Sequence, residues 1–265
     1  MDRGSIIGLL MGLITIGLGM MLKGVSPMAI INPAALIIIF LGTAASICIA
    51  FPMNTLKKIP MLLKVIFTKD KDQEINDVIK LFEGWADATR KEGLLWLEGQ
   101  LKEINDPFLA SGLQLVIDGQ SPDFVKEVML EKINAMEERH QKGRSIFTQA
   151  GTYAPTLGVL GAVIGLIAAL GNMNDVEALG HAISAAFIAT LLGIFSGYVL
   201  WHPFANKLKE KSENEILVKM VMTEGMLSIV NGESPQIVKD KLYSYLPSKD
   251  MLRIDQGGED ETKKA

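Results

Sequence analysis

The sequence predicts an all-α integral membrane protein with four transmembrane helices, arranged as two plus two, and a helical cytoplasmic domain. Four stretches lack Asp, Glu, Lys and Arg, and each is close to the roughly 20 residues that cross a bilayer core of about 30 Å. These stretches cover residues 6–22, 33–51, 154–170 and 182–201. The chain is 49% hydrophobic yet 21% charged, with a mean hydropathy of +0.28, so very apolar blocks alternate with very polar ones.

Composition and motifs exclude several function classes. The net charge of −4 provides no basic surface for nucleic acid. Cys48 is the single cysteine, which excludes an intrachain disulfide, and we expect it to be a small buried hydrophobic residue. The three histidines lack metal-ligand spacing, and the sequence has no HExxH, P-loop or GxGxxG motif in a suitable context. We therefore expect no metal, no cofactor and no enzymatic chemistry.

Residues 1–53 form the first pair of predicted spans. Gly4, Gly8 and Gly12 recur at every fourth position, which either allows a neighbouring helix to approach closely or reflects the tolerance of membrane helices for glycine. Pro33 suits the first turn of the second helix, because its missing amide hydrogen is not needed there. Pro52 ends that helix.

Residues 54–148 are predicted to form the helical cytoplasmic domain. Apolar residues recur at three- and four-residue intervals, as at positions 78, 81, 82, 85 and 88. Two helix starts are marked by the pattern GxSPxxVK, in which a glycine ends one helix, a serine caps the next and a proline occupies its first position. These starts lie at residues 119–122 and 232–235, and similar capping chemistry explains the likeness better than an internal repeat.

Residues 149–203 hold the second pair of spans, residues 204–250 form cytoplasmic C-terminal helices, and residues 251–265 are predicted to be a disordered tail. Lysine and arginine cluster after the second and fourth spans and before the third, whereas the connectors within each pair hold only Lys23. Because positive residues remain on the cytoplasmic side, we expect a multi-pass protein of the inner membrane with both termini and the large domain in the cytoplasm.

The four spans contain no carboxylate. If the protein takes part in proton flow, the titrating group must therefore come from another chain. The spans do contain hydroxyl groups, among them Thr156 in the third and Thr190 in the fourth. Thr190 shares a helix face with Ala186, Gly193 and Gly197, so its hydroxyl either lies in a small-residue groove that a partner helix enters or bonds to the carbonyl one turn earlier.

Other residues also allow two interpretations. Pro155 and Pro203 either mark the ends of spans or act as hinges that release a backbone carbonyl. The mixed-charge segment from Arg90 to Glu98 is either a solvated helix surface or a docking surface for a charged partner.

The sequence TYAPTLGVLGAVIGLIAAL, followed by GHAISAAFIATLLGIFSGYVLWHPFANKLK, resembles the flagellar stator members of the MotA/TolQ/ExbB proton-channel family, over residues 1 to about 250. The resemblance implies a homopentameric ring around two copies of a single-span partner, MotB, whose aspartate accepts the ion. By position, Thr190 matches the threonine facing that aspartate, and Pro155 and Pro203 match the family's two prolines. Arg90 and Glu98 match a charged pair that contacts the rotor protein FliG.

The expected function is therefore a flagellar motor stator subunit that couples ion flow, of protons rather than sodium, to torque on the rotor. One alternative is a TolQ/ExbB-like energiser of envelope transport, although those relatives place one span before the cytoplasmic domain and two after it. A second alternative is a membrane scaffold without ion coupling.

Overall fold

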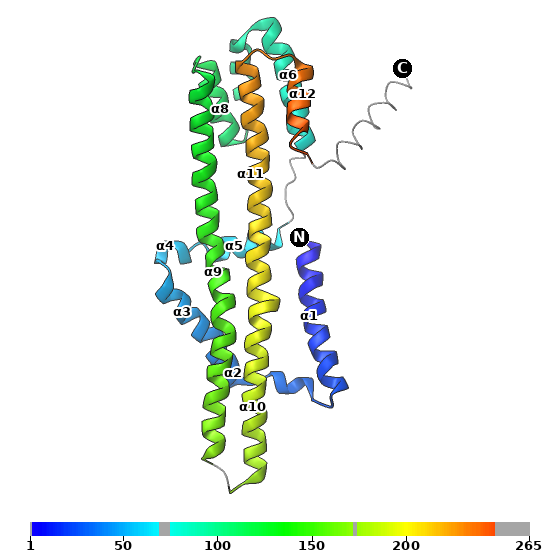
Figure 1. The fold of residues 1–265 in the computed structure, drawn as a ribbon, viewed down its shortest axis with the longest axis vertical. Helices are drawn as coiled ribbons and strands as arrows, with labels where there is room; N and C mark the ends of the chain where they lie inside the picture. The colour runs from blue at the N-terminus through cyan, green and yellow to red at the C-terminus, as the bar shows by residue number, and fades with distance from the viewer. Residues whose placement is uncertain (1, 69–74, 172–173, 247–265) are drawn as a thin grey trace, which may run out of the picture. The chain divides into compact units, whose positions relative to one another are not determined.

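The computed structural model describes residues 2–68, 75–171 and 174–246, and every regular element in these ranges is a helix. The chain packs as two compact units. The first contains Met1–Asp70 and Arg139–Lys211, and the second contains Lys71–Glu138 and Ser212–Ala265. Two long helices, α9 (Pro122–Leu170) and α11 (His202–Val230), contribute residues to both units (Figure 1). The domains predicted from the sequence were divided where the chain changes between apolar and polar, whereas these two units are defined by contacts between residues.

The first unit holds the membrane-spanning helices. Its elements beside α9 and α11 are α1 (Arg3–Leu22), η1 (Pro27–Ile30), α2 (Pro33–Leu36), η2 (Ile37–Leu41), α3 (Gly42–Ala50), α4 (Met53–Leu56), α5 (Ile59–Phe67), α10 (Val176–Phe195) and η4 (Ser196–Trp201). Among the residues that the structure describes, four helices are long and apolar enough to cross a membrane, with mean hydropathies between 1.9 and 2.3 over their most apolar windows. The prediction of four spans, and of an all-α fold, is confirmed.

The third and fourth spans are parts of longer helices. The 49 residues of α9 run without interruption from the charged segment into the third span. The fourth span likewise continues through η4 into α11, as one helix of 55 residues. A change from apolar to polar composition alters the surroundings of a helix without ending it, because the backbone hydrogen bonds are the same in both.

Both predicted helix starts are confirmed. Gly119 has a φ of +71° and Gly232 a φ of +67°, which are left-handed values suited to glycine. Ser121 Oγ accepts a hydrogen bond from the Phe124 amide at 3.3 Å, at the start of α9. Ser234 caps α12 (Pro235–Tyr243) through the same kind of contact with Ile237, at 3.4 Å.

Two expectations about packing in the first pair of spans fit the chain less well. Of the glycines along α1, Gly12 packs against Phe195 and Val199, whereas Gly8 has no neighbouring atom within 4 Å of the position of a Cβ. Cys48 is exposed within the chain, so its predicted burial is wrong for the single subunit. The apolar face of a membrane helix meets lipid or another subunit as readily as a core, and composition does not separate these cases.

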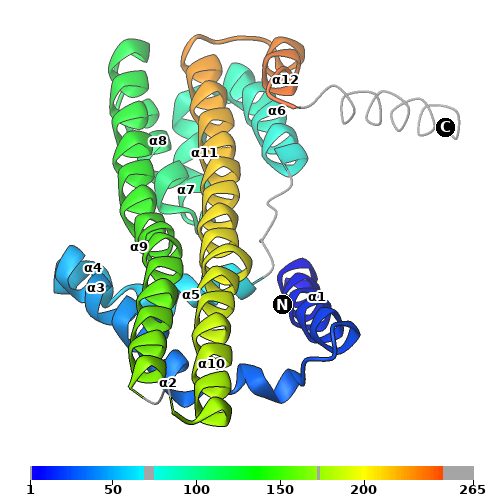
Figure 2. The same cartoon turned by 60° about the horizontal axis from the view of Figure 1, so that its bottom comes forward.

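The second unit is a helical domain built from α6 (Ile75–Glu92), η3 (Leu94–Trp96), α7 (Leu97–Leu101), α8 (Pro107–Ile117), α12 and the adjoining parts of α9 and α11. Figure 2 shows α6 and α12 beside α11. Phe82 is fully buried, its ring lies 5.2 Å from that of Trp85, and it also packs against Gly225 of α11. Val78, Phe82 and Trp85 of the predicted apolar stripe of α6 are thus buried in this core, whereas Leu81 is exposed. The predicted disordered tail, residues 251–265, lies outside the described residues.

Candidate functional site

The third and fourth spans meet along a seam of small residues, which we call the small-residue seam. It consists of Gly151, Ala154, Gly158, Gly161 and Gly165 on α9 and Ala186, Ala189, Gly193 and Gly197 on α10 and η4. A Cβ on Gly158 would lie 2.8 Å from both the Ala189 carbonyl oxygen and the Gly193 Cα. The backbones of α9 and α10 therefore touch directly, as small residues in membrane helices allow.

Pro155 lies inside α9, next to this seam. Because proline has no amide hydrogen, the Gly151 carbonyl loses its usual intrahelical donor. Gly197 packs onto this point, since a Cβ there would lie 2.7 Å from Pro155 Cγ and 2.8 Å from the Gly151 oxygen. The absence of a side chain at Gly197 therefore lets η4 lie against the proline.

Pro203 is the second residue of α11 and is exposed. The six residues before α11 form η4, a π-helical segment in which the His202 amide bonds to the Gly197 carbonyl five residues earlier. A wider helical turn just before a proline accommodates the missing donor without ending the helix. Both prolines thus lie within continuous helices rather than at helix ends.

Thr190 lies at the edge of the small-residue seam. Ala186, one turn earlier, is 3% exposed and packs against Gly165, whereas Thr190 is half-buried. The Thr190 hydroxyl donates a hydrogen bond to the Ala186 carbonyl at 3.3 Å. This is the bond to the carbonyl one turn earlier, which was one of the two interpretations that the sequence allowed. Within one chain α9 already occupies the groove at Ala186, Gly193 and Gly197, so Thr190 remains the more accessible group of this face.

Thr156 lies two residues from both Ala154 and Gly158, and therefore on the opposite side of α9 from α10. It is exposed, and its hydroxyl donates to the Tyr153 carbonyl at 2.7 Å. A single chain does not bring Thr156 and Thr190 together.

Two polar groups in the membrane-spanning unit were missed by sequence reasoning. Thr43 Oγ1 and Trp201 Nε1 are buried and have no hydrogen-bond partner among the described residues. Thr43 lies between Ile39 and Ile47 on the face of the second span that packs toward α9. Unpaired polar atoms are costly in an apolar environment, so both groups are candidates for hydrogen bonds with water. The sequence signal for Thr43 was a single threonine within the apolar second span, in the stretch LGTAAS.

In the second unit, Arg90 occupies the last turn of α6 and Glu98 the first turn of α7. Both are exposed, as is Leu95 between them. Gly93, with a φ of +83°, ends α6 and turns the chain toward α7. The two charges therefore flank a short turn.

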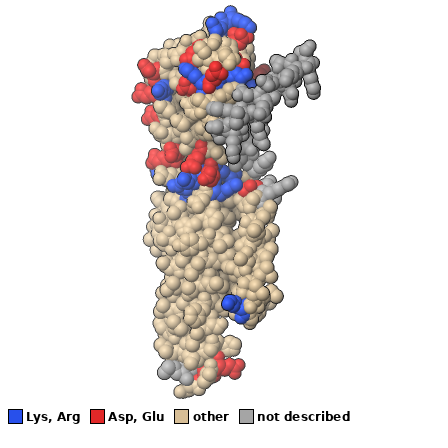
Figure 3. Space-filling view, turned by 45° about the vertical axis from the view of Figure 1, so that its right-hand side comes forward, with Lys and Arg blue, Asp and Glu red and all other residues tan. Residues whose placement is uncertain are grey.

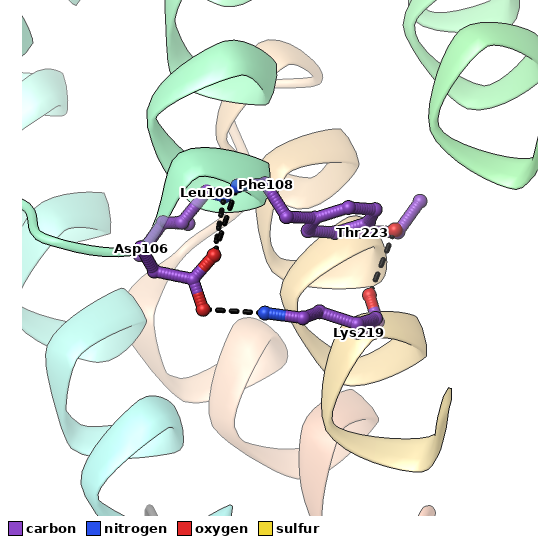
Figure 4. A network of polar contacts seen from close by, with 5 residues as sticks. All are labelled: Asp106, Phe108, Leu109, Lys219 and Thr223. Atoms are coloured by element: carbon purple, nitrogen blue, oxygen red, sulfur yellow. Dashed lines mark hydrogen bonds and ion pairs between the residues drawn. The ribbon is translucent and has the colours of Figure 1, made fainter. Parts of the chain in front are cut away.

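A partly buried ion pair joins α8 to α11 in the same unit (Figure 4). Asp106 caps α8 by accepting from the Phe108 amide at 2.9 Å and the Leu109 amide at 3.3 Å. Its other oxygen pairs with Lys219 of α11, which is only 8% exposed and whose Nζ lies 5.2 Å from the centre of the Phe108 ring. Burial alone would raise the pKa of Asp106. The hydrogen bond and charge of Lys219, with the two amides, outweigh it and lower that pKa below its usual range.

Comparison with known proteins places these features in a family. Residues 100–242 match the MotA/TolQ/ExbB proton channel family. The chain belongs to this family. It is 54% identical to Motility protein A of Bacillus subtilis, over 98% of this chain and 96% of that protein. It is also 31% identical to Chemotaxis protein PomA of Vibrio alginolyticus, over 97% of this chain and 100% of that protein.

Solved structures of family members have the same fold. The flagellar MotAB stator complex from Bacillus subtilis includes a chain that matches with a TM-score of 0.91, covering 96% of this chain and 99% of that one. A chain of MotAB from C. jejuni matches with a TM-score of 0.89 at 29% identity, covering 94% of this chain and 97% of that one. The family segment contains both seam helices, Thr156 and Thr190, whereas Arg90 and Glu98 precede it.

Proposed function

We propose that this chain is the ring subunit of a flagellar motor stator, which couples ion flow across the inner membrane to torque on the rotor. The observation that carries the proposal is a hydroxyl at the edge of the small-residue seam, Thr190, in spans that hold no carboxylate. Likeness to Motility protein A and to chains of MotAB stator complexes supports it. Because the family is one of proton channels, the site serves ion passage rather than bond chemistry.

The titrating group comes from a partner in this proposal. MotB, a single-span protein, supplies an aspartate that takes up the ion beside Thr190. The Thr190 proton is engaged by the Ala186 carbonyl, so its oxygen remains an acceptor toward the partner. Thr156 and Thr190 lie on separate faces, and an ion path that uses both hydroxyls needs more than one copy of the chain. This requirement is consistent with a homopentameric ring.

Torque follows from a change in helix packing. Ion binding favours one of two arrangements of the spans only if the ion interacts differently with each arrangement. Pro155 and Pro203 are the points where the third and fourth spans lack a backbone donor, so we assign the hinges to them. Each packing step turns the ring around the MotB dimer.

The lysines beside the spans support an orientation with both termini and the second unit in the cytoplasm. There, Arg90 and Glu98 contact the rotor protein FliG through exposed charges. Opposite charges across such a surface determine the partner and the speed of encounter more than the affinity. Protons are the proposed ion, because the spans of this chain add no carboxylate or other acidic oxygen to the aspartate that MotB supplies.

Replacement of the Bacillus subtilis Motility protein A by this chain, together with its own partner, tests the proposal. We expect swimming to be restored, with a speed that does not change with sodium concentration at fixed pH. A complex that reaches the membrane and yet leaves the cells non-motile would argue against a stator role. A speed that rises with sodium would argue against protons.

A further inference from the structure

The short helices α4 and α5 and the turn between them present an outward face that we call the basic belt, which consists of Met53, Lys57, Lys58, Met61 and Lys64. We propose that the basic belt binds the headgroups of anionic phospholipids. This inference goes beyond ion coupling and does not depend on it, because it requires only that the four spans lie in a bilayer.

The opposite face of α5 packs against the spans, and this packing fixes the orientation of α5. Ile66 is fully buried in a cluster with Phe147 of α9 and Phe204 of α11. The Phe67 ring lies edge-on to that of Phe204, with centres 5.6 Å apart. Leu62 lies against Gly143 of α9, where a Cβ would be 3.2 Å from its methyl groups. The belt residues therefore point away from the helix bundle.

The helix lies at the level where the charge-free spans end. Phe147 follows Arg144, after which α9 has no Asp, Glu, Lys or Arg to its end. Phe204 precedes Lys207, the first charged residue after the fourth span. The Asp2 amide donates to the Phe67 carbonyl at 2.8 Å, which places the start of α1 at this level too. In Figure 3 a band of charged side chains borders one end of a long, largely uncharged surface, and a few charged side chains lie near its other end.

The belt combines cations with apolar side chains. Lys57, Lys58 and Lys64 are exposed, and Met53 and Met61 are 64% and 63% exposed. Residues 53–68 contain no Asp or Glu, and among the described residues no ion pair involves these three lysines. Nothing in this part of the chain therefore neutralises the three charges.

This combination fits an anionic lipid better than a soluble partner. A lysine at the end of a span lays its aliphatic stem along the apolar boundary and directs its ammonium group to the phosphates. Methionine side chains between the lysines enter the adjacent acyl region, as on interfacial helices. Each lysine near the surface of an anionic leaflet raises the binding constant for that leaflet about fivefold. Lys57, Lys58 and Lys64 together select anionic over zwitterionic lipid.

The test compares lipids held at the surface of the full complex with its partner, in phosphatidylcholine vesicles. Spin-labelled phosphatidylglycerol or phosphatidylcholine is present in both leaflets, and the motionally restricted fraction gives the lipid preference. The test variant is Lys57→Gln, Lys58→Gln and Lys64→Gln together. A matched control removes three exposed lysines of the second unit, by Lys80→Gln, Lys102→Gln and Lys126→Gln.

We expect the native complex to prefer phosphatidylglycerol, and the belt variant to lose that preference by about threefold or more. The control should keep the preference, and so should a charge-preserving variant with Lys57→Arg, Lys58→Arg and Lys64→Arg together. An unchanged preference in the belt variant would overturn the proposal, as would an equal loss in the control. A belt variant that keeps the preference but loses its subunit assembly would assign this face to a contact between copies instead.

Discussion

A methyl group on Gly158 is expected to force the third and fourth spans apart. In Gly158→Ala the new carbon would lie 2.8 Å from the Ala189 carbonyl oxygen and from the Gly193 Cα, whereas carbon contacts are optimal near 3.5–4.0 Å. Both neighbours are backbone atoms, so no side chain can rotate away. Overpacking of this kind costs about 1–3 kcal/mol. The higher helix propensity of alanine offsets roughly 0.5–1 kcal/mol of that cost.

Gly180→Ala is the matched control, because Gly180 lies in α10, the other helix of the small-residue seam, and has no atom within 4 Å of its Cβ position. Gly180→Ala should therefore gain only the stabilisation from the higher helix propensity of alanine, with no overpacking. The two variants then differ by about 2 kcal/mol, which corresponds to roughly 4–8 °C in the midpoint of unfolding for a chain of this size.

Thermal unfolding of the purified complex in detergent measures this difference. We expect a lower midpoint for Gly158→Ala than for the native chain, and an unchanged or higher one for Gly180→Ala. Equal midpoints for the two variants would refute direct backbone contact along the small-residue seam.

Three further predictions concern the charges and the pathway. Reversal of both charges, by Arg90→Glu with Glu98→Lys, should stop swimming and abolish crosslinking to the rotor while membrane levels stay native; unaltered motility would remove these residues from the rotor contact. Thr190→Val, which keeps the shape and removes the hydroxyl, should slow rotation by about five- to tenfold, as expected for the loss of one hydrogen bond of about 1–1.5 kcal/mol; native speed would exclude a role in the pathway. Asp106→Asn keeps the helix cap but leaves Lys219 without its partner, which should cost about 3 kcal/mol at neutral pH. Because the folded pKa of Asp106 is lowered, its stabilisation is present above the ordinary value of 3.8 and is lost as pH falls through the lower folded value. Acid unfolding curves of the native chain and Asp106→Asn should therefore converge as pH falls through the lowered folded pKa of Asp106, below 3.8, and a constant gap would contradict the assignment.

Local signals in the sequence predicted several elements correctly. Ser121 and Ser234, each followed by proline and preceded by a left-handed glycine, mark helix starts because capping involves only neighbouring residues. The four spans were predictable from length and the absence of charge, because the bilayer sets both.

Features that depend on packing were not predictable in the same way. The small residues around Gly193 pack against α9 of the same chain. Their spacing in the sequence would suit a helix of another protein equally well. The partly buried pair of Asp106 and Lys219 joins residues 113 positions apart. An aspartate before a proline is a common helix cap, but nothing in the sequence near Asp106 or Lys219 indicates that the two pair. The burial expected for Cys48 was wrong because lipid-facing and core-facing apolar helices have the same composition.

The central claim is that this chain guides an ion whose binding carboxylate belongs to another protein. The most direct test is the rotation rate of tethered cells that make this chain with its native partner, or with a partner whose membrane aspartate is replaced by asparagine. The account predicts rotation with the native partner and none with the amide, at equal amounts of complex in the membrane. Rotation sustained by the amide-bearing partner would contradict it, because residues 6–22, 33–51, 154–170 and 182–201 of this chain contain no carboxylate to replace the lost one.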